Sequence, residues 1–176
     1  MKSETFSIKV NHKIKPFHKI IEVDSDKSLS IRSFLIGSIC QNISTVTNVL
    51  ESEDVLSTIQ ACRKLGVKIV KSKKGNYKIF GKGLGSFFAK KNTNLNFGNS
   101  GTLSRLLLAL LATTPNIDVK VRGDNSLNKR NMRKLIELMS EFGATFMPKK
   151  KYHFPLRMIS SEMPIGIKYV AGVSAQ

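Results

Sequence analysis

The sequence predicts an α/β (α+β) fold made of repeated βαβαββ units, and three observations lead to this prediction. Runs rich in β-branched residues alternate with segments whose apolar residues recur at the period of a helix. The order strand, helix, strand, helix, strand, strand then recurs after about 75 residues, which is typical of a domain built from copies of one unit. Finally, Leu-Gly-Val-Lys-Ile at 65–69 parallels Phe-Gly-Ala-Thr-Phe at 142–146. We expect units at about 20–82 and 93–150.

The first unit is expected to begin with a short strand at Ile20–Val23 and a helix from about Ser28 to Gln41. The buried stripe of that helix consists of Ile31, Phe34, Leu35 and Ile39. Ser52 can cap a second helix, whose first turn carries Glu53 and Asp54 where the helix dipole favours acidic side chains. The other expected elements are a strand at 45–50, this second helix up to Gly66, and a hairpin of 67–70 with 77–80.

The second unit repeats this order further along the chain. Its elements are expected at 95–97, 102–112, 118–122, 131–142 and 145–147. Pro155 and Pro164 bracket a loop, and Ile165–Val170 would begin a third unit at about residue 165. Because the chain stops at Gln176 with that unit barely begun, we expect a truncated domain.

Composition favours an ordinary globular protein with an unusually basic surface. The 176 residues suffice for the core of one domain, and 29 Lys and Arg against 12 Asp and Glu give a net charge of +17. The lysines gather in turns, where they are either solvated or attract phosphorylated metabolites. Nucleic-acid binding is disfavoured because Trp is absent and aromatic residues make up only 7%. No membrane helix or secretory signal is found in the sequence, so we expect a cytoplasmic protein.

Cysteine and histidine usage indicates neither a disulfide nor a metal centre. Cys40 and Cys62 fall on apolar faces of the expected helices and are interpreted as buried free thiols. The three histidines occur singly, at His12, His18 and His153, so we expect no metal site.

Two turn-to-helix junctions are built alike and predict anion sites. Asn-Ser-Gly-Thr-Leu-Ser-Arg at 99–105 places a glycine turn, hydroxyls and a cation at a helix start, and Asp-Lys-Ser-Leu-Ser-Ile-Arg at 26–32 also combines hydroxyls with cations. A cation at a helix N-terminus forgoes about 0.3 to 1 kcal/mol, so Lys27 and Arg32 indicate a bound anion unless they are simply solvated. The polar loop 123–132 contributes Arg130, whose guanidinium suits a phosphate or a carboxylate.

These segments together resemble the enolpyruvyl transferases, and among them the EPSP synthase (3-phosphoshikimate 1-carboxyvinyltransferase) family. Lys-Ser-x-Ser-x-Arg at 27–32 is similar to the family's first substrate motif, and Asn-Ser-Gly-Thr-x-x-Arg at 99–105 to its second. Gly-Asp-x-Ser-Leu-x-Lys-Arg-x-Met at 123–132 resembles the third, and Ser-Ala-Gln at 174–176 the start of a fourth. The motifs stand in the family's order and cover the chain from about residue 20.

The resemblance implies a reaction and a domain organisation. The 5-hydroxyl of shikimate 3-phosphate would attack C2 of phosphoenolpyruvate as C3 is protonated, and the adduct would expel phosphate to leave 5-enolpyruvylshikimate 3-phosphate. The reaction is a step of the shikimate pathway, which leads to chorismate and the aromatic amino acids. It would need no cofactor and no metal. The full-length enzyme is expected to be monomeric. Family members have two similar domains of three units each. Residues 20–176 would then be an incomplete first domain, and 1–19 would belong with the second.

The resemblance also implies three groups of site residues. Those expected to bind shikimate 3-phosphate are Lys27, Ser28, Arg32, Ser174, Ala175 and Gln176. Those expected to bind phosphoenolpyruvate are Lys27, Asn99, Gly101, Arg130 and Gln176. Thr102 and Arg105 would shape the phosphoenolpyruvate pocket, and Lys27 and Gln176 would be the catalytic residues.

The chain departs from the family's motifs at three positions. Asn131 stands where the family usually has proline, Leu106 where some members have proline, and Ala175 where some have serine at the phosphate. The family's acid/base aspartate, glutamate and lysine lie in the second domain. We therefore expect this chain to be inactive by itself.

Three other functions stay open on the sequence. UDP-N-acetylglucosamine enolpyruvyl transferase shares the fold, but it typically has Lys-Asn where this chain has Lys27 and Ser28. A basic nucleic-acid-binding module would account for the net charge and would bind duplex in a salt-dependent way. The third open function is that of a structural or regulatory remnant, which would bind the sugar-like ligand without catalysing a reaction.

Overall fold

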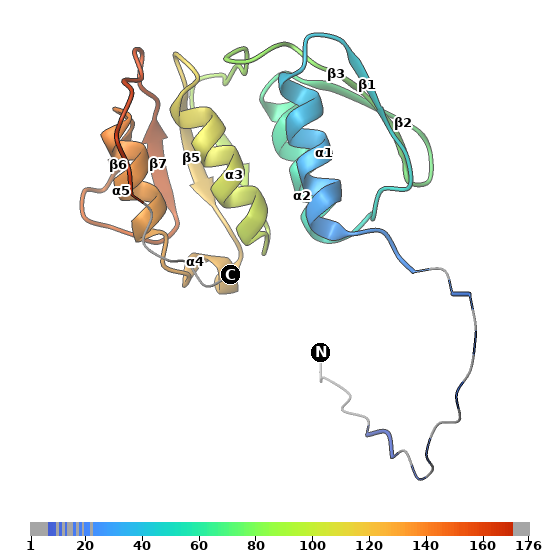
Figure 1. Cartoon of the computed structure of the whole chain (residues 1–176). Helices are drawn as coiled ribbons and strands as arrows, with labels where there is room; N and C mark the ends of the chain where they lie inside the picture. Colours follow the sequence, from blue (N-terminus) through green and yellow to red (C-terminus); the bar gives the residue numbers. More distant parts are fainter. Residues whose placement is uncertain are drawn as a thin grey trace.

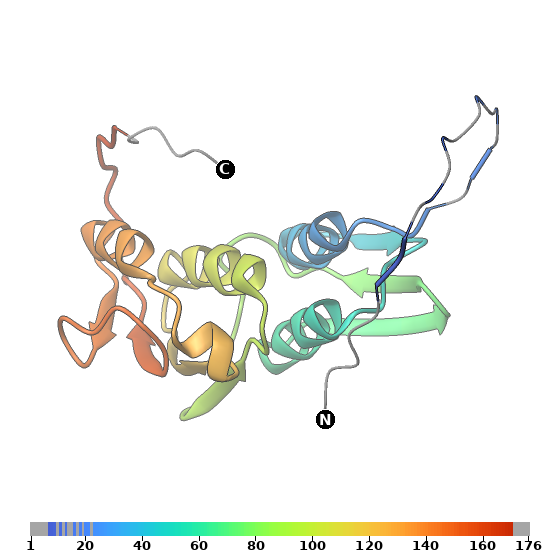
Figure 2. The same ribbon diagram turned by 90° about the horizontal axis from the view of Figure 1, so that it is seen from below.

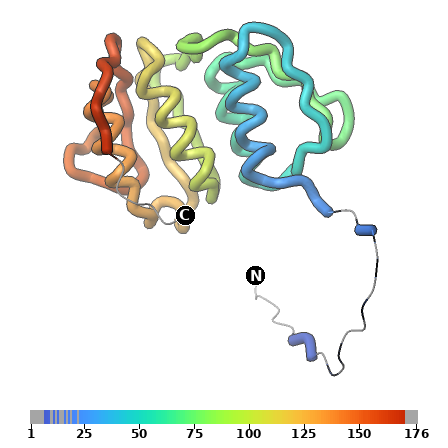
Figure 3. Tube along the Cα trace, in the orientation of Figure 1, coloured from blue at the N-terminus to red at the C-terminus, as the bar shows by residue number. Residues whose placement is uncertain are grey.

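The fold consists of two similar α/β units in a computed structural model that describes residues 7–9, 11, 13, 16, 18, 20–21 and 23–170. The helices are α1 (Lys27–Ile39), α2 (Glu53–Lys64), α3 (Gly101–Ala112), α4 (Asn125–Asn128) and α5 (Arg133–Glu141). The strands are β1 (Ile43–Val46), β2 (Lys68–Lys73), β3 (Asn76–Phe80), β4 (Thr93–Asn96), β5 (Asp118–Arg122), β6 (Thr145–Met147) and β7 (Leu156–Ile159). The two units lie side by side, the first blue to green and the second yellow to red in Figure 3.

The helices of the first unit lie between its sheet and the second unit. Both views place α1 and α2 between the first sheet and α3 (Figures 1 and 2). The first sheet has the strand order β1-β3-β2 and the second the order β4-β5-β7-β6. Because α1 packs against both α2 and α3, the units meet through their first helices, and the N-terminal ends of these helices carry the predicted anion sites.

The first unit forms as its apolar periodicity predicts. Asp26 caps α1, since its Oδ1 accepts a hydrogen bond of 2.6 Å from the amide of Leu29. Further along the helix, the buried ring of Phe34 meets the ring of Tyr77 from β3 edge to face, with centroids 5.2 Å apart. Strands β2 and β3 form the expected antiparallel hairpin, and β1 pairs with the other side of β3.

The second unit combines one parallel with two antiparallel strand pairs. Strands β4 and β5 pair in parallel, as a crossover through α3 requires. Strand β7 pairs antiparallel with both β5 and β6. Ser100 caps α3 by accepting a 3.2 Å hydrogen bond from the amide of Leu103. The side chains of Leu103, Leu107 and Leu111 are fully buried, so α3 is anchored in the core and its first turn is fixed in place.

The strand expected at Ile20–Val23 is wrong. Residues 20, 21 and 23 form no strand, and the side chain of Ile20 is 89% exposed. Strands β1, β3 and β2 correspond to β5, β7 and β6 of the second unit, in which β4 adds a fourth strand beside β5. No described residue takes that place beside β1, so the outer edge of β1 is open.

Three further boundaries differ from the sequence prediction. The strand expected at 45–50 ends at Val46, because Asn48 has a φ of +55° and turns the chain toward the hairpin. The second unit continues to Ile159 through β7, where buried Leu156 and Met158 alternate with exposed Arg157. The loop between the prolines therefore contains a strand. Residues 164–170 form no strand, so the expected start of a third unit is not seen there.

The two cysteines have different environments. Cys62 is buried in α2 as predicted, and burial raises the pKa of its thiol to about 11. The prediction of a buried thiol is wrong for Cys40, which is exposed. The physical reason is that α1 ends at Ile39, so Cys40 is already in extended backbone and no longer on the helix face that faces the core.

A carboxylate fixes the segment that leads into α2. Glu51 accepts hydrogen bonds of 2.8 Å from the Lys71 ammonium, the Gly75 amide and the Tyr77 hydroxyl. The bond from Lys71, with those from Gly75 and Tyr77, lowers the pKa of Glu51 to about 2. Because these partners belong to the β2–β3 hairpin, the start of α2 is held against the first sheet.

Candidate functional site

The centre of the candidate site is the start of α3. Gly98 has a φ of +56°, a conformation that glycine adopts without strain, and it turns the chain from β4 into the helix. The carbonyl oxygen of Gly98 accepts a 2.8 Å hydrogen bond from the amide of Asp124. This bond joins the α3 junction to the loop 123–132. The two predicted anion-binding segments of the second unit therefore lie next to each other.

Two guanidinium groups lie close to the first residue of α3. Arg130 donates a 2.7 Å hydrogen bond from Nη2 to Oδ1 of Asn99, and Arg105 donates one of 3.2 Å from Nη1 to the carbonyl of Gly101. A Cβ at Gly101 would lie 2.8 Å from Nη1 of Arg130 and 2.9 Å from Nη1 of Arg105. Gly101 thus lets both guanidinium groups approach the helix start more closely than any other residue would.

The helix start itself offers hydrogen-bond donors. The amides of Leu103 and Ser104 are bonded to the side-chain and backbone oxygens of Ser100. The amides of Gly101 and Thr102 make no hydrogen bond within the described part of the chain. Free N–H groups at a helix N-terminus bind anions, and the helix dipole adds to the attraction.

Lys27 joins this group from the first unit. A hollow of about 280 Å³ is lined by Lys27, Asp54, Asn99, Gly101, Thr102, Arg105 and Arg130. The ammonium of Lys27 lies 3.0 Å from Oδ2 of Asp54, which belongs to the first turn of α2. Three cationic side chains and one carboxylate therefore surround the hollow. The arrangement suits a small ligand that carries more than one negative charge.

Other predicted site residues lie elsewhere. Ser28 is half-buried beside Lys27 on α1 and does not line the hollow. Arg32 lines a separate apolar groove of about 370 Å³ between α1 and α3. It is five residues after Lys27, which corresponds to a rotation of about 140° around the helix and a rise of about 7.5 Å. Ser174, Ala175 and Gln176 lie outside the described residues.

Asp54 is the site residue that sequence reasoning missed. An acidic residue in the first turn of a helix is explained by the helix dipole alone, so nothing in the sequence pattern assigns Asp54 to the site. The one available signal was position: Asp54 lies at the start of the next helix along the chain after the helix that carries the motif 27–32. Its contact with Lys27 shows that the N-terminal ends of α1, α2 and α3 meet at the hollow.

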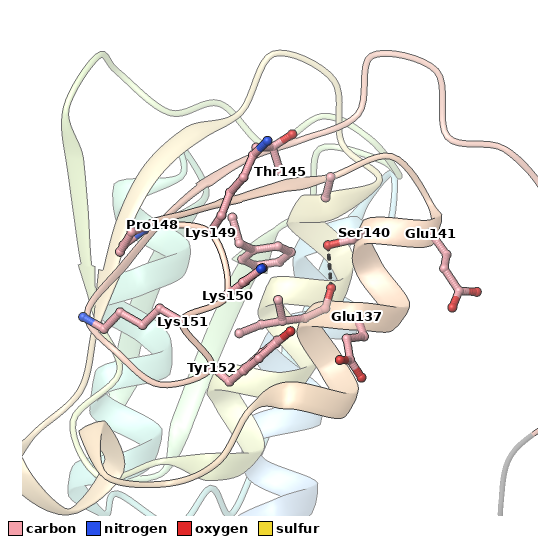
Figure 4. A pocket seen from close by; sticks show the side chains of 12 residues that line it. Glu137, Ser140, Glu141, Thr145, Pro148, Lys149, Lys150, Lys151 and Tyr152 are labelled. Atoms are coloured by element: carbon pink, nitrogen blue, oxygen red, sulfur yellow. Dashed lines mark hydrogen bonds between the residues drawn. The ribbon is translucent and has the colours of Figure 1, made fainter.

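A second hollow has a different character. It has a volume of about 520 Å³ and lies between α5 and the turn after β6 (Figure 4). Its charged lining consists of Lys149, Lys150 and Lys151 on the turn and Glu137 and Glu141 on α5. None of the predicted site residues lines it. Two carboxylates accompany the three ammonium groups here, whereas one carboxylate accompanies three cations at α3, so this hollow is less suited to a polyanion.

The described residues contain no group of three or more His, Cys, Asp or Glu side chains that could hold a metal ion. Within the same part of the chain, no helix has both the length and the apolar character that a membrane span requires.

Comparisons with known proteins agree with the motifs. A family model described as EPSP synthase (3-phosphoshikimate 1-carboxyvinyltransferase) matches residues 11–176. The 3-phosphoshikimate 1-carboxyvinyltransferase of Syntrophomonas wolfei is 33% identical over 167 residues, which are 95% of this chain and 38% of that protein. The one from Oceanobacillus iheyensis is 42% identical over 147 residues, which are 83% of this chain and 34% of that protein.

A solved structure supports the same relationship. EPSP synthase from Acinetobacter baumannii matches with a TM-score of 0.78 and 36% sequence identity, over 89% of this chain and 36% of that chain. The chain thus spans somewhat more than a third of the length of these relatives. Its motifs, its repeated α/β units and the match over residues 11–176 lead to one conclusion: the chain belongs to the EPSP synthase (3-phosphoshikimate 1-carboxyvinyltransferase) family.

Proposed function

We propose that this chain carries the phosphoenolpyruvate-binding part of an active site that transfers an enolpyruvyl group to shikimate 3-phosphate. In this reaction the 5-hydroxyl oxygen bonds to C2 of phosphoenolpyruvate while C3 takes up a proton. The hydroxyl gives up its proton as it adds, and the tetrahedral adduct then loses phosphate from C2 and one proton from the C3 methyl group, which restores the double bond and leaves 5-enolpyruvylshikimate 3-phosphate. The reaction would be a cytoplasmic step of the shikimate pathway.

The observation that supports the proposal most strongly is the group of donors around the start of α3. Phosphoenolpyruvate carries a phosphate and a carboxylate. The guanidinium of Arg130 and the amides of Gly101 and Thr102 suit one of these anions, and the ammonium of Lys27, which lines the same hollow, suits the other. The amides are fixed before the ligand arrives because α3 is anchored in the core, and the guanidinium of Arg130 is held by its hydrogen bond to Asn99. Such preorganised charges stabilise the negative charge of a transition state without reorganisation.

The shikimate 3-phosphate contacts form the second part of the proposal. Lys27 would contact both substrates. Ser28 and Arg32 on α1 would hold the carboxylate end of shikimate 3-phosphate, and the residues at 174–176 would approach its phosphate and ring. Support for this part comes from family membership and from the motif at 27–32.

Calorimetric titration of the chain with phosphoenolpyruvate, in the presence of shikimate 3-phosphate, tests the proposal. Arg130→Ala removes a charge-assisted hydrogen-bond donor worth about 1.5 to 3 kcal/mol, so binding should weaken by roughly ten- to a hundredfold. Arg133→Ala is the matched control, because Arg133 is an exposed arginine that pairs with Glu137 on α5. Equal affinity of wild type and Arg130→Ala would refute the proposal. Salt-dependent binding of duplex nucleic acid without any response to either substrate would favour a basic binding module instead.

A further inference from the structure

A carboxylate lies in a site that otherwise attracts anions. Asp54 is the one acidic residue among those that line the hollow at α3. Its side chain is only 16% exposed, whereas that of its partner Lys27 is 50% exposed. A negative charge here repels an anionic ligand, so a simple anion-binding site would be better without it.

The structure holds Asp54 firmly in this position. It lies in the first turn of α2, a position where the helix dipole interacts favourably with an acidic side chain. The segment before α2 is fixed to the β2–β3 hairpin by the three hydrogen bonds of Glu51. The hydroxyl of Thr58, one turn further along α2, bonds to the backbone carbonyl of Asp54 at 2.9 Å. Asp54 is therefore held in place beside the longer and more exposed side chain of Lys27.

We propose that Asp54 is the positioning residue for Lys27. A lysine ammonium has three N–H donors on a flexible stem, and holding such a side chain in one rotamer costs conformational entropy. The ion pair of 3.0 Å with Asp54 holds the ammonium at the wall of the hollow that both residues line. The N–H donors of the ammonium are then available to the anionic group of phosphoenolpyruvate that is not bound at the start of α3. This inference rests on the proposed function, because Lys27 is taken there to bind phosphoenolpyruvate.

A double-mutant cycle on phosphoenolpyruvate affinity tests this role. The variants are Lys27→Ala, Asp54→Ala and the two together, titrated by calorimetry in the presence of shikimate 3-phosphate. An exposed ion pair contributes up to about 1 kcal/mol, so Asp54→Ala should weaken binding by roughly two- to fivefold. In the Lys27→Ala background the same change should no longer weaken binding. Asp54→Asn keeps the shape of the side chain and should weaken binding in the same way.

Glu53→Ala is the matched control. Glu53 precedes Asp54 in the same turn of α2 and does not line the hollow, so its removal changes the net charge and the helix-dipole interaction by the same amount. It should leave phosphoenolpyruvate affinity within twofold of wild type or slightly tighter. Thermal melts of all variants identify any effect that comes from unfolding.

The possible outcomes separate the two proposals. If wild type binds no phosphoenolpyruvate, the proposed function fails, and the role of Asp54 fails with it. If wild type binds but Asp54→Ala and Asp54→Asn bind more tightly, the carboxylate only repels the ligand, and the positioning role alone is overturned. Equal weakening by Asp54→Ala in the wild-type and Lys27→Ala backgrounds also overturns it, since the effect would then not pass through Lys27.

Discussion

Gly101→Ala is a sharp perturbation of the site, because it adds one methyl group between two guanidinium groups. The new Cβ would lie 2.8 Å from Nη1 of Arg130 and 2.9 Å from Nη1 of Arg105, whereas ordinary van der Waals contact begins at 3.4 Å. Both guanidinium groups must therefore retreat by at least about 0.5 Å. The backbone at Gly101 is helical and accepts alanine, which favours a helix by up to about 1 kcal/mol.

We therefore expect Gly101→Ala to damage anion binding and to leave folding intact. A displaced guanidinium loses a charge-assisted hydrogen bond of about 1.5 to 3 kcal/mol, which corresponds to a phosphoenolpyruvate affinity about ten- to a hundredfold weaker. The Tm should stay within about 4 °C of wild type.

Calorimetry with phosphoenolpyruvate and a thermal melt measure the two effects on the same preparation. Gly166→Ala is the control, because no heavy atom lies within 4 Å of the Cβ it would add. Undiminished affinity in Gly101→Ala would refute the reasoning. A collapse of the Tm would also refute it, since the methyl group would then disturb the packing of α3.

Three further predictions concern stability and surface chemistry. The pKa of Glu51 is lowered from 4.5 to about 2, so its contribution to stability is complete above about pH 4.5 and is lost as the pH falls toward 2. Glu51→Gln should therefore lower the Tm at pH 6, and the difference from wild type should shrink as the pH approaches 2; a constant difference would contradict this. A thiol reagent should label exposed Cys40 quickly and buried Cys62 only on unfolding, and equal labelling rates in the folded state would contradict the structure. Ile43 is 57% exposed on the open edge of β1, so Ile43→Lys should reduce any self-association seen by sedimentation at high concentration, whereas unchanged association would exclude this edge as its cause.

Helices α1, α2, α3 and α5 were predictable because each buries a stripe of apolar residues, whereas α4 lies in the segment expected to be a polar loop and buries only Leu127. The stripe of α1 and the leucines of α3 fix the location of both helices, and Ser100 marks the start of α3. Strand β7 was missed because Pro155 directly precedes it and favours a loop, although a proline is tolerated at the start of a strand. The strand at 20–23 was predicted from β-branched residues that find no partner strand among the described residues.

The site was predictable where a residue type is unusual for its position. A cation at a helix start indicated Lys27 as a ligand-binding residue, and a guanidinium in the loop 123–132 indicated Arg130; the structure brings both to one hollow with Gly101. Asp54 was not predictable in the same way, since an acid in a first helical turn is ordinary. Arg32 has the residue type of a ligand-binding group, but its place around α1 turns it toward the apolar groove.

A titration followed by two-dimensional NMR of ¹⁵N-labelled chain tests the central claim most directly. If an anion binds at the start of α3, phosphoenolpyruvate should move the amide resonances of Gly101 and Thr102 most, together with the side-chain Nε resonance of Arg130. The backbone amide resonance of Lys150, which lies on the turn beside the second hollow, should keep its chemical shift. Shifts confined to the lysine-rich turn at 149–151, with the resonances of Gly101 and Thr102 unmoved, would contradict the assignment of the site.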